Sequence, residues 1–521
     1  MSNNDSGRKM LLTAGFMAFA TFAAKVLGLI RDSLTGAYFG TGIEADAFML
    51  ATKVPTTLFD VVIGGVISAT FIPIFNDILT KENKNEASVF ANKFITMIIM
   101  ATVIISLFGI LFAEQLVSFM APNFDAATHE LSVKLTTIMF PMIIFTGIAF
   151  SFVGILQSYG EYNIPSIISL VSNLAIILYF IVFGKKFGVT GLAVTMIISW
   201  SLQVAVQIPS LIKFKFRYRP NFHLRDRHIW SAVLLALPML VSTWVQPLYT
   251  LVNARFASHM QGAYSSLEYA NRLYMIVTGV FSFVVTNLIF PKLAKANAKE
   301  DSKEAGALIT TSLKAVIIII APLMAGIIIL SQPITSIIYE HGELDSSSSA
   351  IVANALSCYA IGMIFLAINE VLSKAFFSMK RSVTPMITSI ISMIFDIILV
   401  SAFYEFIKDD PMRLTGGLAA AAACGSIVNA LLNGFMLFKR IPGLLTARDA
   451  VTIAKIAAAT LIMAATVYFE YAFVSGFAEG FIGDVIVCII CGATGAAIYG
   501  VLMIAFKVPE IIQLLPKSKK V

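Results

Sequence analysis

Long, mostly apolar segments alternate with short polar segments along almost the whole chain. A helix of about 20 residues is enough to cross the ~30 Å hydrocarbon core of a bilayer. Fourteen segments of this kind occur, at approximately 10–38, 46–78, 90–113, 131–156, 163–184, 188–211, 228–257, 267–296, 307–330, 350–378, 383–405, 414–438, 449–471 and 482–506. The pattern predicts an all-α polytopic membrane protein with fourteen transmembrane helices.

Composition and loop charge agree with this fold class. Of the 521 residues 58% are hydrophobic and 13% charged, and the mean hydropathy is +0.86, well outside the range of soluble domains. The net charge of +7 comes from basic residues in short loops, including six cations within 213–227. If both chain ends are cytoplasmic, the outer loops hold only Lys185, Lys186, Lys408 and Arg413. This asymmetry is a topology signal, so we expect both termini inside and no nucleic-acid partner.

Two parts of the chain repeat a pattern at an offset of about 220 residues. Near Pro165 and near Pro385, a helix end is followed by a polar turn, the proline and a span rich in Ser and Ile. Six spans, an even number, separate equivalent elements, so the halves would be parallel repeats with a transport site between them. The expected lobes are 1–218 (helices 1–6) and 219–440 (helices 7–12), followed by helices 13–14 and a basic tail in 441–521. The alternative is that apolar helices resemble one another by composition alone.

Charged residues interrupt several of the predicted helices. A Lys or Arg at the bilayer centre costs roughly 2.5–3.5 kcal/mol on insertion scales, so it faces protein or water. The candidate substrate-binding residues are Lys25, Arg31, Asp46, Lys53, Arg255 and Arg272, with Asp32, Asp60 and Glu268 as supporting charges. Cations outnumber nearby acids on the first span and around the seventh, which predicts a positively charged cavity for an anionic cargo. The alternative is structural ion pairing or a place near a helix end, above all for Asp46, Arg255 and Glu268.

The spacing of these charges puts several of them on common helix faces. Asp46, Lys53 and Asp60 are seven residues apart and form one stripe on the second span. Glu268 and Arg272 are four residues apart, the spacing at which an acid and a base can pair. The stripe cannot face lipid, so we expect it to line the cavity.

The eleventh predicted span carries an isolated acid, Asp396, with Ser392 one turn before it. This pair is either a site for a monovalent cation, Na⁺ or H⁺, or a polar contact between helices. The five histidines lack metal-ligand spacing, and the chain has neither a GK[ST] phosphate loop nor a GxSxG motif. We therefore expect no metal site, no cofactor apart from a coupling ion, and no catalytic centre.

The motifs around these charges resemble a known family. The runs KVLGLIRD at 25–32, YFG at 38–40, and ADAF at 45–48 with KVP at 53–55 are similar to the opening motifs of the MurJ (MviN) lipid II flippases. The run YANRL at 269–273, followed by IFPKLAK at 289–295, resembles helix 8 of the same family. The resemblance covers essentially the whole chain and places it in the multidrug/oligosaccharidyl-lipid/polysaccharide (MOP) exporter superfamily.

The resemblance implies two six-helix lobes around a cationic cavity, with helices 13 and 14 forming a groove for a lipid tail. It also implies that the cargo is the undecaprenyl-pyrophosphate-linked peptidoglycan precursor, moved from the inner to the outer leaflet of the bacterial inner membrane. Position by position, Arg31, Asp46, Lys53 and Arg272 match the family's functional charges, and Lys25 stands where an arginine is usual.

The second span departs from the family pattern. Phe59 and Asp60 stand where many members have two arginines, and Gly64 where they have Glu. This leaves open how the headgroup is held there. In some members a sodium site lies on helices 7, 11 and 12, to which Asp396 would contribute one ligand.

The expected mechanism is alternating access by a monomer, with pyrophosphate docking on the cations and reset driven by membrane potential or a cation gradient. Membrane potential supplies ~2.3 kcal/mol per charge per 100 mV.

Three rival functions stay open: a flippase for another polyprenyl-linked glycan, a cation-coupled drug exporter, and a membrane-embedded glycan transferase. An exporter of cationic drugs would favour an acidic cavity. A transferase would need a cluster of carboxylates, for which Asp32, Asp46 and Asp60 are the candidates.

Overall fold

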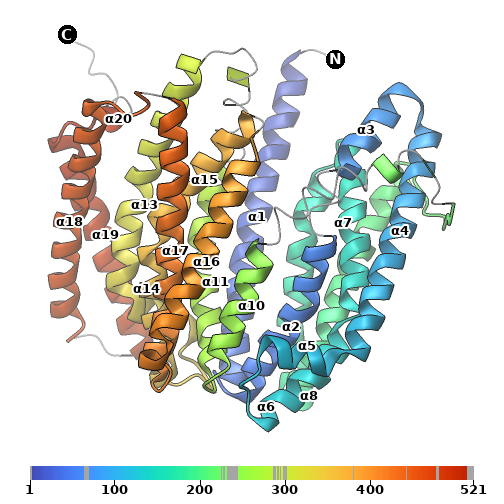
Figure 1. Cartoon of the computed structure of the whole chain (residues 1–521), viewed down its shortest axis with the longest axis horizontal. Coiled ribbons are helices and arrows are strands. Elements are labelled where there is room, and N and C mark those ends of the chain that lie inside the picture. The colour runs from blue at the N-terminus through green and yellow to red at the C-terminus, as the bar shows by residue number, and fades with distance from the viewer. Residues whose placement is uncertain are drawn as a thin grey trace. The chain divides into compact units, whose positions relative to one another are not determined.

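The computed structural model describes residues 3–63, 70–223, 226, 229–231, 245–284, 289, 293, 295–296, 302–379, 381–441, 443–476 and 480–512. Within these residues every regular element is a helix (Figure 1). In chain order the helices are α1 (Asn3–Phe39), α2 (Ile43–Val62), α3 (Ile72–Lys81), α4 (Lys84–Leu111), α5 (Ala113–Met120), α6 (Ala126–Met139), α7 (Met142–Ser158), α8 (Asn163–Lys213), α10 (Val245–Ala257), α11 (Ala263–Val284), α13 (Ser302–Tyr339), α14 (Ser346–Ile361), α15 (Met363–Ser378), α16 (Val383–Ile407), α17 (Pro411–Arg440), α18 (Ala447–Val474), α19 (Gly480–Ala505) and α20 (Pro509–Ile512). The all-α prediction is confirmed.

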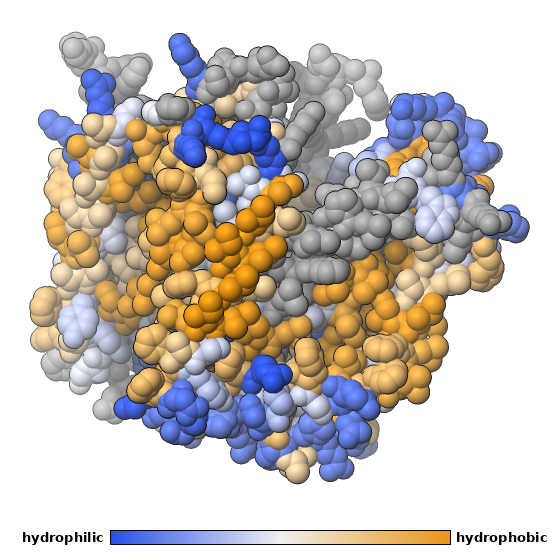
Figure 2. Space-filling view, in the orientation of Figure 1, coloured by the Kyte–Doolittle hydropathy of each residue, from blue (hydrophilic) through white to orange (hydrophobic). Residues whose placement is uncertain are grey.

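The described helices include eight that are long and apolar enough to cross a membrane, or up to ten if two bent pairs each form one span. The pairs are α6 with α7, bent by 42°, and α14 with α15, bent by 43°. Figure 2 shows apolar side chains over the middle of α16 and α17 and hydrophilic ones near their ends, as expected for helices surrounded by lipid. The chain is an integral membrane protein. The expected spans 46–78, 228–257 and 267–296 lie partly outside the described residues, so the total of fourteen stays a prediction.

The chain divides into two compact units, Met1–Ser265 and Ser266–Val521. Part of the helix series recurs along the chain. The bent pair at 126–158 returns 220 residues later at 346–378. An aspartate accepts hydrogen bonds from backbone N–H groups at the start of each pair, Asp125 in the first and Asp345 in the second. The duplication is therefore visible in the helix boundaries. The first unit also contains α10, which the sequence pattern assigns to the second lobe, and the expected lobe boundaries stay a prediction.

In the first unit α1 packs along α8, and this contact positions the charged face of α1. The Tyr38 hydroxyl donates a 2.8 Å hydrogen bond to the carbonyl of Phe180. Its ring lies so close to Gly184 that a Cβ there would come within 2.5 Å of Tyr38 Cε1. A short non-helical break at Gly188, with φ of +52°, separates the two spans within α8. The predicted spans 163–184 and 188–211 correspond to these two halves.

In the second unit a shared cation on α13 links α18 and α20. Lys314 Nζ on α13 lies 2.9 Å from Asp449 Oδ1 and 2.6 Å from Glu510 Oε1, and the three side chains are only 13 to 19% exposed. Asp449 also closes the first turn of α18, because its Oδ2 accepts hydrogen bonds from the N–H and hydroxyl of Thr446. One lysine therefore holds two mostly buried acids from the C-terminal part of the chain.

Replacing Lys314 with Met is expected to lower the free energy of unfolding by about 3 kcal/mol, because it leaves two carboxylates buried without their cation. Thermal unfolding of the purified chain in detergent measures this as a lower midpoint. Lys314→Arg keeps the charge and should stay closer to wild type, and the exposed Lys134→Met is the control for general loss of a lysine. Equal midpoints for Lys314→Met and Lys134→Met would contradict the shared-cation interpretation.

Candidate functional site

Arg31 on α1 is held in a defined orientation by neighbours on two helices. Its Nε and Nη2 donate to Asp32 Oδ1 at 3.0 and 2.8 Å, and its Nη1 donates to Asn173 Oδ1 on α8 at 3.1 Å. The Arg31 side chain is 27% exposed, whereas that of Asp32 is 7% exposed. The guanidinium is thus fixed from one side and accessible from another.

Asn173 was not predicted as a site residue, yet it determines where Arg31 points. Its Nδ2 donates to the carbonyl of Ala24 at 3.0 Å while its Oδ1 accepts from Arg31. Gly28 lies next to it, since a Cβ at that position would be in ordinary van der Waals contact, 3.6 Å from Asn173 Nδ2. The signal in the sequence was an asparagine in the middle of an apolar span, a residue that needs a partner in hydrocarbon.

Arg31 has an acid partner on its own helix. From the sequence we expected cations to outnumber nearby acids on the first span, and in the structure Arg31 pairs with Asp32 on the same helix. A guanidinium carries five N–H groups. Three of these are used by Asp32 and Asn173, and the other two make no hydrogen bond within the described part of the chain. Arg31 is therefore an oriented donor with capacity left for an anion, not an isolated charge.

The other cations of the first two helices lie nearby in sequence but differ in environment. Lys25, two turns before Asp32 on α1, is half-buried and forms no ion pair with any residue that the structure describes. Lys53 on α2 is also half-buried, and Asp60, two turns further on, is exposed and lies close enough to interact electrostatically with it. The heptad stripe on α2 therefore runs from a buried end at Asp46 to an exposed end at Asp60.

Asp46 caps a helix. Its side chain is fully buried, and its two oxygens accept hydrogen bonds from the backbone N–H groups of Gly262 at 2.6 Å and Ser265 at 2.7 Å. These N–H groups belong to the turn before α11 and to its first turn, where they have no partner within the helix. Gly262 has a φ of +80° and lies against the backbone of Thr41, so this turn requires a glycine. The geometry favours the structural alternative for Asp46 over contact with cargo.

The remaining candidates lie at the end of α10 and along α11. Arg255 is exposed in the last turn of α10, and its Nη1 donates a long, 3.4 Å hydrogen bond to the carbonyl of Phe119. Glu268 is buried, at 7% exposure, and Arg272 one turn later is half-buried. Arg272 belongs to the second compact unit and Arg31 and Lys53 to the first, so their convergence on one chamber stays a prediction.

Asp396 has the environment of a group that lacks a partner. The residue is 1% exposed, and neither carboxylate oxygen has a hydrogen-bond partner among the described residues. Ser392, one turn earlier on α16, donates to the carbonyl of Gly425 on α17, and a Cβ on Gly425 would lie 3.6 Å from Asp396 Cβ. The described residues contain no cluster of three acid, histidine or cysteine side chains able to hold a metal ion. Two carboxylate oxygens without a partner among the described residues suit a single monovalent cation or a proton.

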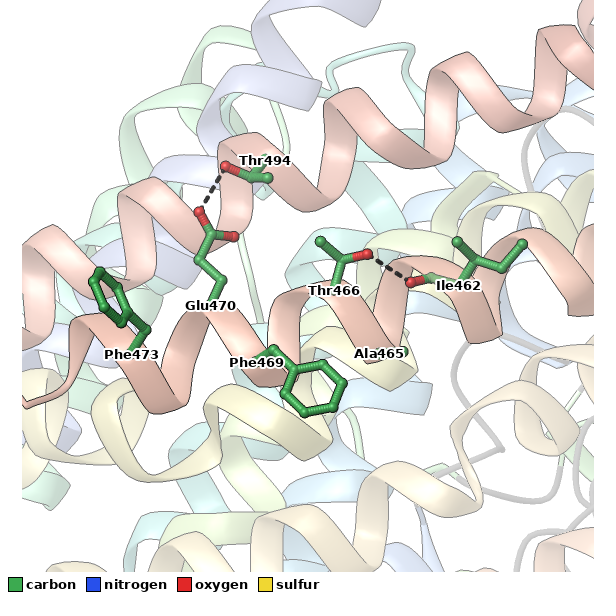
Figure 3. Close-up of a pocket in the computed structure, with 7 residues that line it drawn as sticks. All are labelled: Ile462, Ala465, Thr466, Phe469, Glu470, Phe473 and Thr494. Carbon is green, nitrogen blue, oxygen red and sulfur yellow. Dashed lines mark hydrogen bonds between the residues drawn. The ribbon is translucent and has the colours of Figure 1, made fainter.

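The C-terminal helices carry an open pocket of about 750 Å³ (Figure 3). Five of its lining residues come from one face of α18, and Glu470 of α18 and Thr494 of α19 add polar groups; the lining is Ile462, Ala465, Thr466, Phe469, Glu470, Phe473 and Thr494. Thr494 Oγ1 donates to Glu470 Oε1 at 3.0 Å, and Glu470 Oε2 is buried without a partner in the described chain. The pocket is mostly apolar and could receive a hydrocarbon chain.

Comparison with known sequences identifies related proteins along most of the chain. Residues 35–487 match the family model described as lipid II flippase MurJ. A probable lipid II flippase MurJ of Rickettsia prowazekii is 27% identical over 381 residues, which cover 73% of this chain and 75% of that protein. The lipid II flippase MurJ of Burkholderia cenocepacia is 26% identical over 442 residues, or 83% of this chain and 84% of that protein.

Comparison with solved structures shows the fold. A structure of lipid II flippase MurJ in an inward closed conformation superposes with a TM-score of 0.78 at 24% identity, covering 95% of this chain and 99% of that one. An inward-facing multidrug resistance MATE family transporter of the MOP superfamily gives a TM-score of 0.68 at 15% identity, covering 81% of this chain and 95% of that one. Both have the helical architecture described above.

Proposed function

Because the chain belongs to the lipid II flippase MurJ family, we propose that it moves an undecaprenyl-pyrophosphate-linked peptidoglycan precursor from the inner to the outer leaflet of the bacterial inner membrane. The observation that carries this proposal is the family match over 35–487, which includes Asp46, Lys53 and Arg272. Lys25 and Arg31 precede the matched range. The proposal includes both termini in the cytoplasm, function as a monomer, and transport without chemical change of the cargo.

Arg31 is the proposed centre of pyrophosphate recognition. A guanidinium whose orientation is already fixed loses little side-chain entropy on binding, and its planar N–H groups match phosphate oxygens. Asp32 and Asn173 act as positioning residues, since they bind Arg31 rather than the cargo. Lys25 and Lys53 add positive charge as point cations, and Arg272 does the same from α11.

The lipid tail has a candidate place on the C-terminal helices. The pocket on α18 and α19 is lined largely by Ile, Ala and Phe side chains, which suits a polyprenyl chain (Figure 3). We propose that the tail lies in this pocket while the cations of the N-terminal helices α1 and α2 hold the charged headgroup.

The energy source in this proposal is the membrane potential or a gradient of Na⁺ or H⁺. The buried Asp396, with two oxygens free of partners in the described chain and Ser392 beside it, is the proposed site of the coupling ion. Binding of one cation there would neutralise a charge that is otherwise costly at this depth.

Two measurements test the function. Expression of the chain in cells depleted of their own lipid II flippase is expected to restore growth, because the proposed cargo is the same. In proteoliposomes, the chain should move labelled lipid II across the bilayer unchanged, with a rate that responds to an imposed potential or Na⁺ gradient. Transport of another polyprenyl-linked glycan but not lipid II would favour the first rival function, and chemical conversion of the label would favour a transferase.

A further inference from the structure

A basic segment follows α8 and lies beside α4 (Figure 1). We call residues 213–223 the basic strap. It begins with Lys213, the last residue of α8, and continues as non-helical chain through His223. Its side chains alternate between two environments, so its cations all reach the surface.

The cations and the aromatic residues of the strap lie in different environments. The four cations are exposed: Lys213, Lys215, Arg217 and Arg219. The aromatic residues between them turn inward: Phe214 stacks on Tyr159 with ring centroids 5.3 Å apart, Phe216 is 2% exposed, and Tyr218 shares a 3.0 Å hydrogen bond with Thr96. None of the four cations forms an ion pair with a residue that the structure describes.

The backbone of the strap is fixed to α4 by side chains from one face of that helix. Asn92 Oδ1 accepts from the N–H of Arg219 at 3.1 Å, and Thr96 Oγ1 accepts from the N–H of Asn221 at 3.0 Å. Just beyond the strap, Asp226 pairs with Lys93 at 2.6 Å, and both side chains are mostly buried. The cations therefore project from an anchored chain, so their spacing is set before any ligand arrives.

The strap lies at the boundary between apolar and polar surface. Ile208 and Ile212, in the last turns of α8, are 44 and 55% exposed, as expected for side chains that face lipid. Phe222, at the other end of the strap, is 69% exposed. Large exposed apolar side chains on both sides of a row of cations indicate the depth of phospholipid headgroups.

We propose that the basic strap is a binding site for the headgroups of anionic phospholipids in the leaflet that borders it. The row of cations, which have no acid partner among the described residues, is complementary to phosphate diesters, and the flanking apolar side chains are complementary to the acyl chains below them. A loop that served only as a topology signal during insertion would need the charges but not the aromatic anchors or the hydrogen bonds to Asn92 and Thr96. This inference is independent of the transported cargo.

The test uses the full chain in detergent, titrated with dioctanoyl-phosphatidylglycerol at low ionic strength, with dioctanoyl-phosphatidylcholine and inorganic phosphate as separate arms. Wild type should bind the anionic lipid well above the zwitterionic one, and phosphate alone should bind weakly because it lacks acyl chains. The triple variant K215Q/R217Q/R219Q should lose about 100-fold in affinity for phosphatidylglycerol, since each cation near a membrane surface is worth ~1 kcal/mol.

A matched control variant removes three positive charges from parts of the chain outside the strap. K134Q/K186Q/R413Q neutralises three exposed cations scattered over the chain and should retain wild-type affinity. An equal loss in both triple variants would show a general charge effect and overturn the proposal. So would equal binding of the two lipids, or phosphate binding as tightly as the anionic lipid. Thermal unfolding midpoints confirm that the variants compared are folded.

A second variant tests the anchoring. N92A/T96V removes the side chains that hold the strap backbone but leaves all four cations in place. Its affinity for phosphatidylglycerol should fall several-fold, because the cations must then be ordered on binding. Unchanged affinity would show that charge alone is sufficient and that the strap is not a built site.

Discussion

Replacing Arg31 with Ala is expected to lower the rate of lipid II transport in proteoliposomes by about 100-fold. The substitution removes the oriented guanidinium proposed to hold the pyrophosphate, and charge-assisted hydrogen bonds of this kind contribute about 1.5–3 kcal/mol. It also removes the cation that pairs with the mostly buried Asp32 at 2.8 Å, which makes the site less favourable for an anion. Initial rates measured at equal amounts of folded, reconstituted protein give the comparison.

Two further variants separate the charge of Arg31 from its geometry. Arg31→Lys keeps the charge but loses the planar fork, so an intermediate loss of about 10-fold is expected. Asn173→Ala leaves the arginine in place but removes its 3.1 Å contact across to α8, so apparent affinity for the cargo should weaken more than the maximal rate. Exposed Lys134→Ala is the control. Transport by Arg31→Ala within twofold of this control would remove Arg31 from the proposed site.

The architecture could be predicted from the sequence because it depends on local properties. Length and apolarity of a segment determine whether it can span a bilayer, and both are read directly from neighbouring residues. The repeat was equally accessible: Asp125 and Asp345 stand 220 residues apart and cap equivalent bent pairs. These features need no knowledge of which helix packs against which.

The partners of the charged residues could not be predicted in the same way, because they come from distant parts of the chain. Arg31 and Asn173 are 142 residues apart, and Asp46 and Gly262 are 216 apart. Periodicity gives the direction of a side chain around its helix, but it does not give how deeply that side chain is buried in the folded protein. The heptad spacing on α2 puts Asp46 and Asp60 in one stripe, yet the first is fully buried and the second is exposed.

Replacing Asp46 with Ala is expected to destabilise the protein by about 4 kcal/mol, because two buried backbone N–H groups lose a charged acceptor and each such bond contributes about 1.5–3 kcal/mol. Asp46→Asn should cost about half as much, since the amide keeps one acceptor oxygen but presents its NH₂ group to the other N–H. Thermal unfolding of the purified variants in detergent gives the order wild type, Asn, Ala. The exposed Asp60→Ala, from the same stripe, should change the midpoint little.

The same variants decide between the two roles that the sequence left open for Asp46. A residue that caps the start of α11 affects the amount of folded protein, so transport per folded molecule of Asp46→Asn should stay near wild type while its unfolding midpoint falls. A residue that contacts cargo shows the reverse pattern, with a wild-type midpoint and slow transport. The second pattern would contradict the cap as the role of Asp46, even though both of its oxygens accept backbone hydrogen bonds.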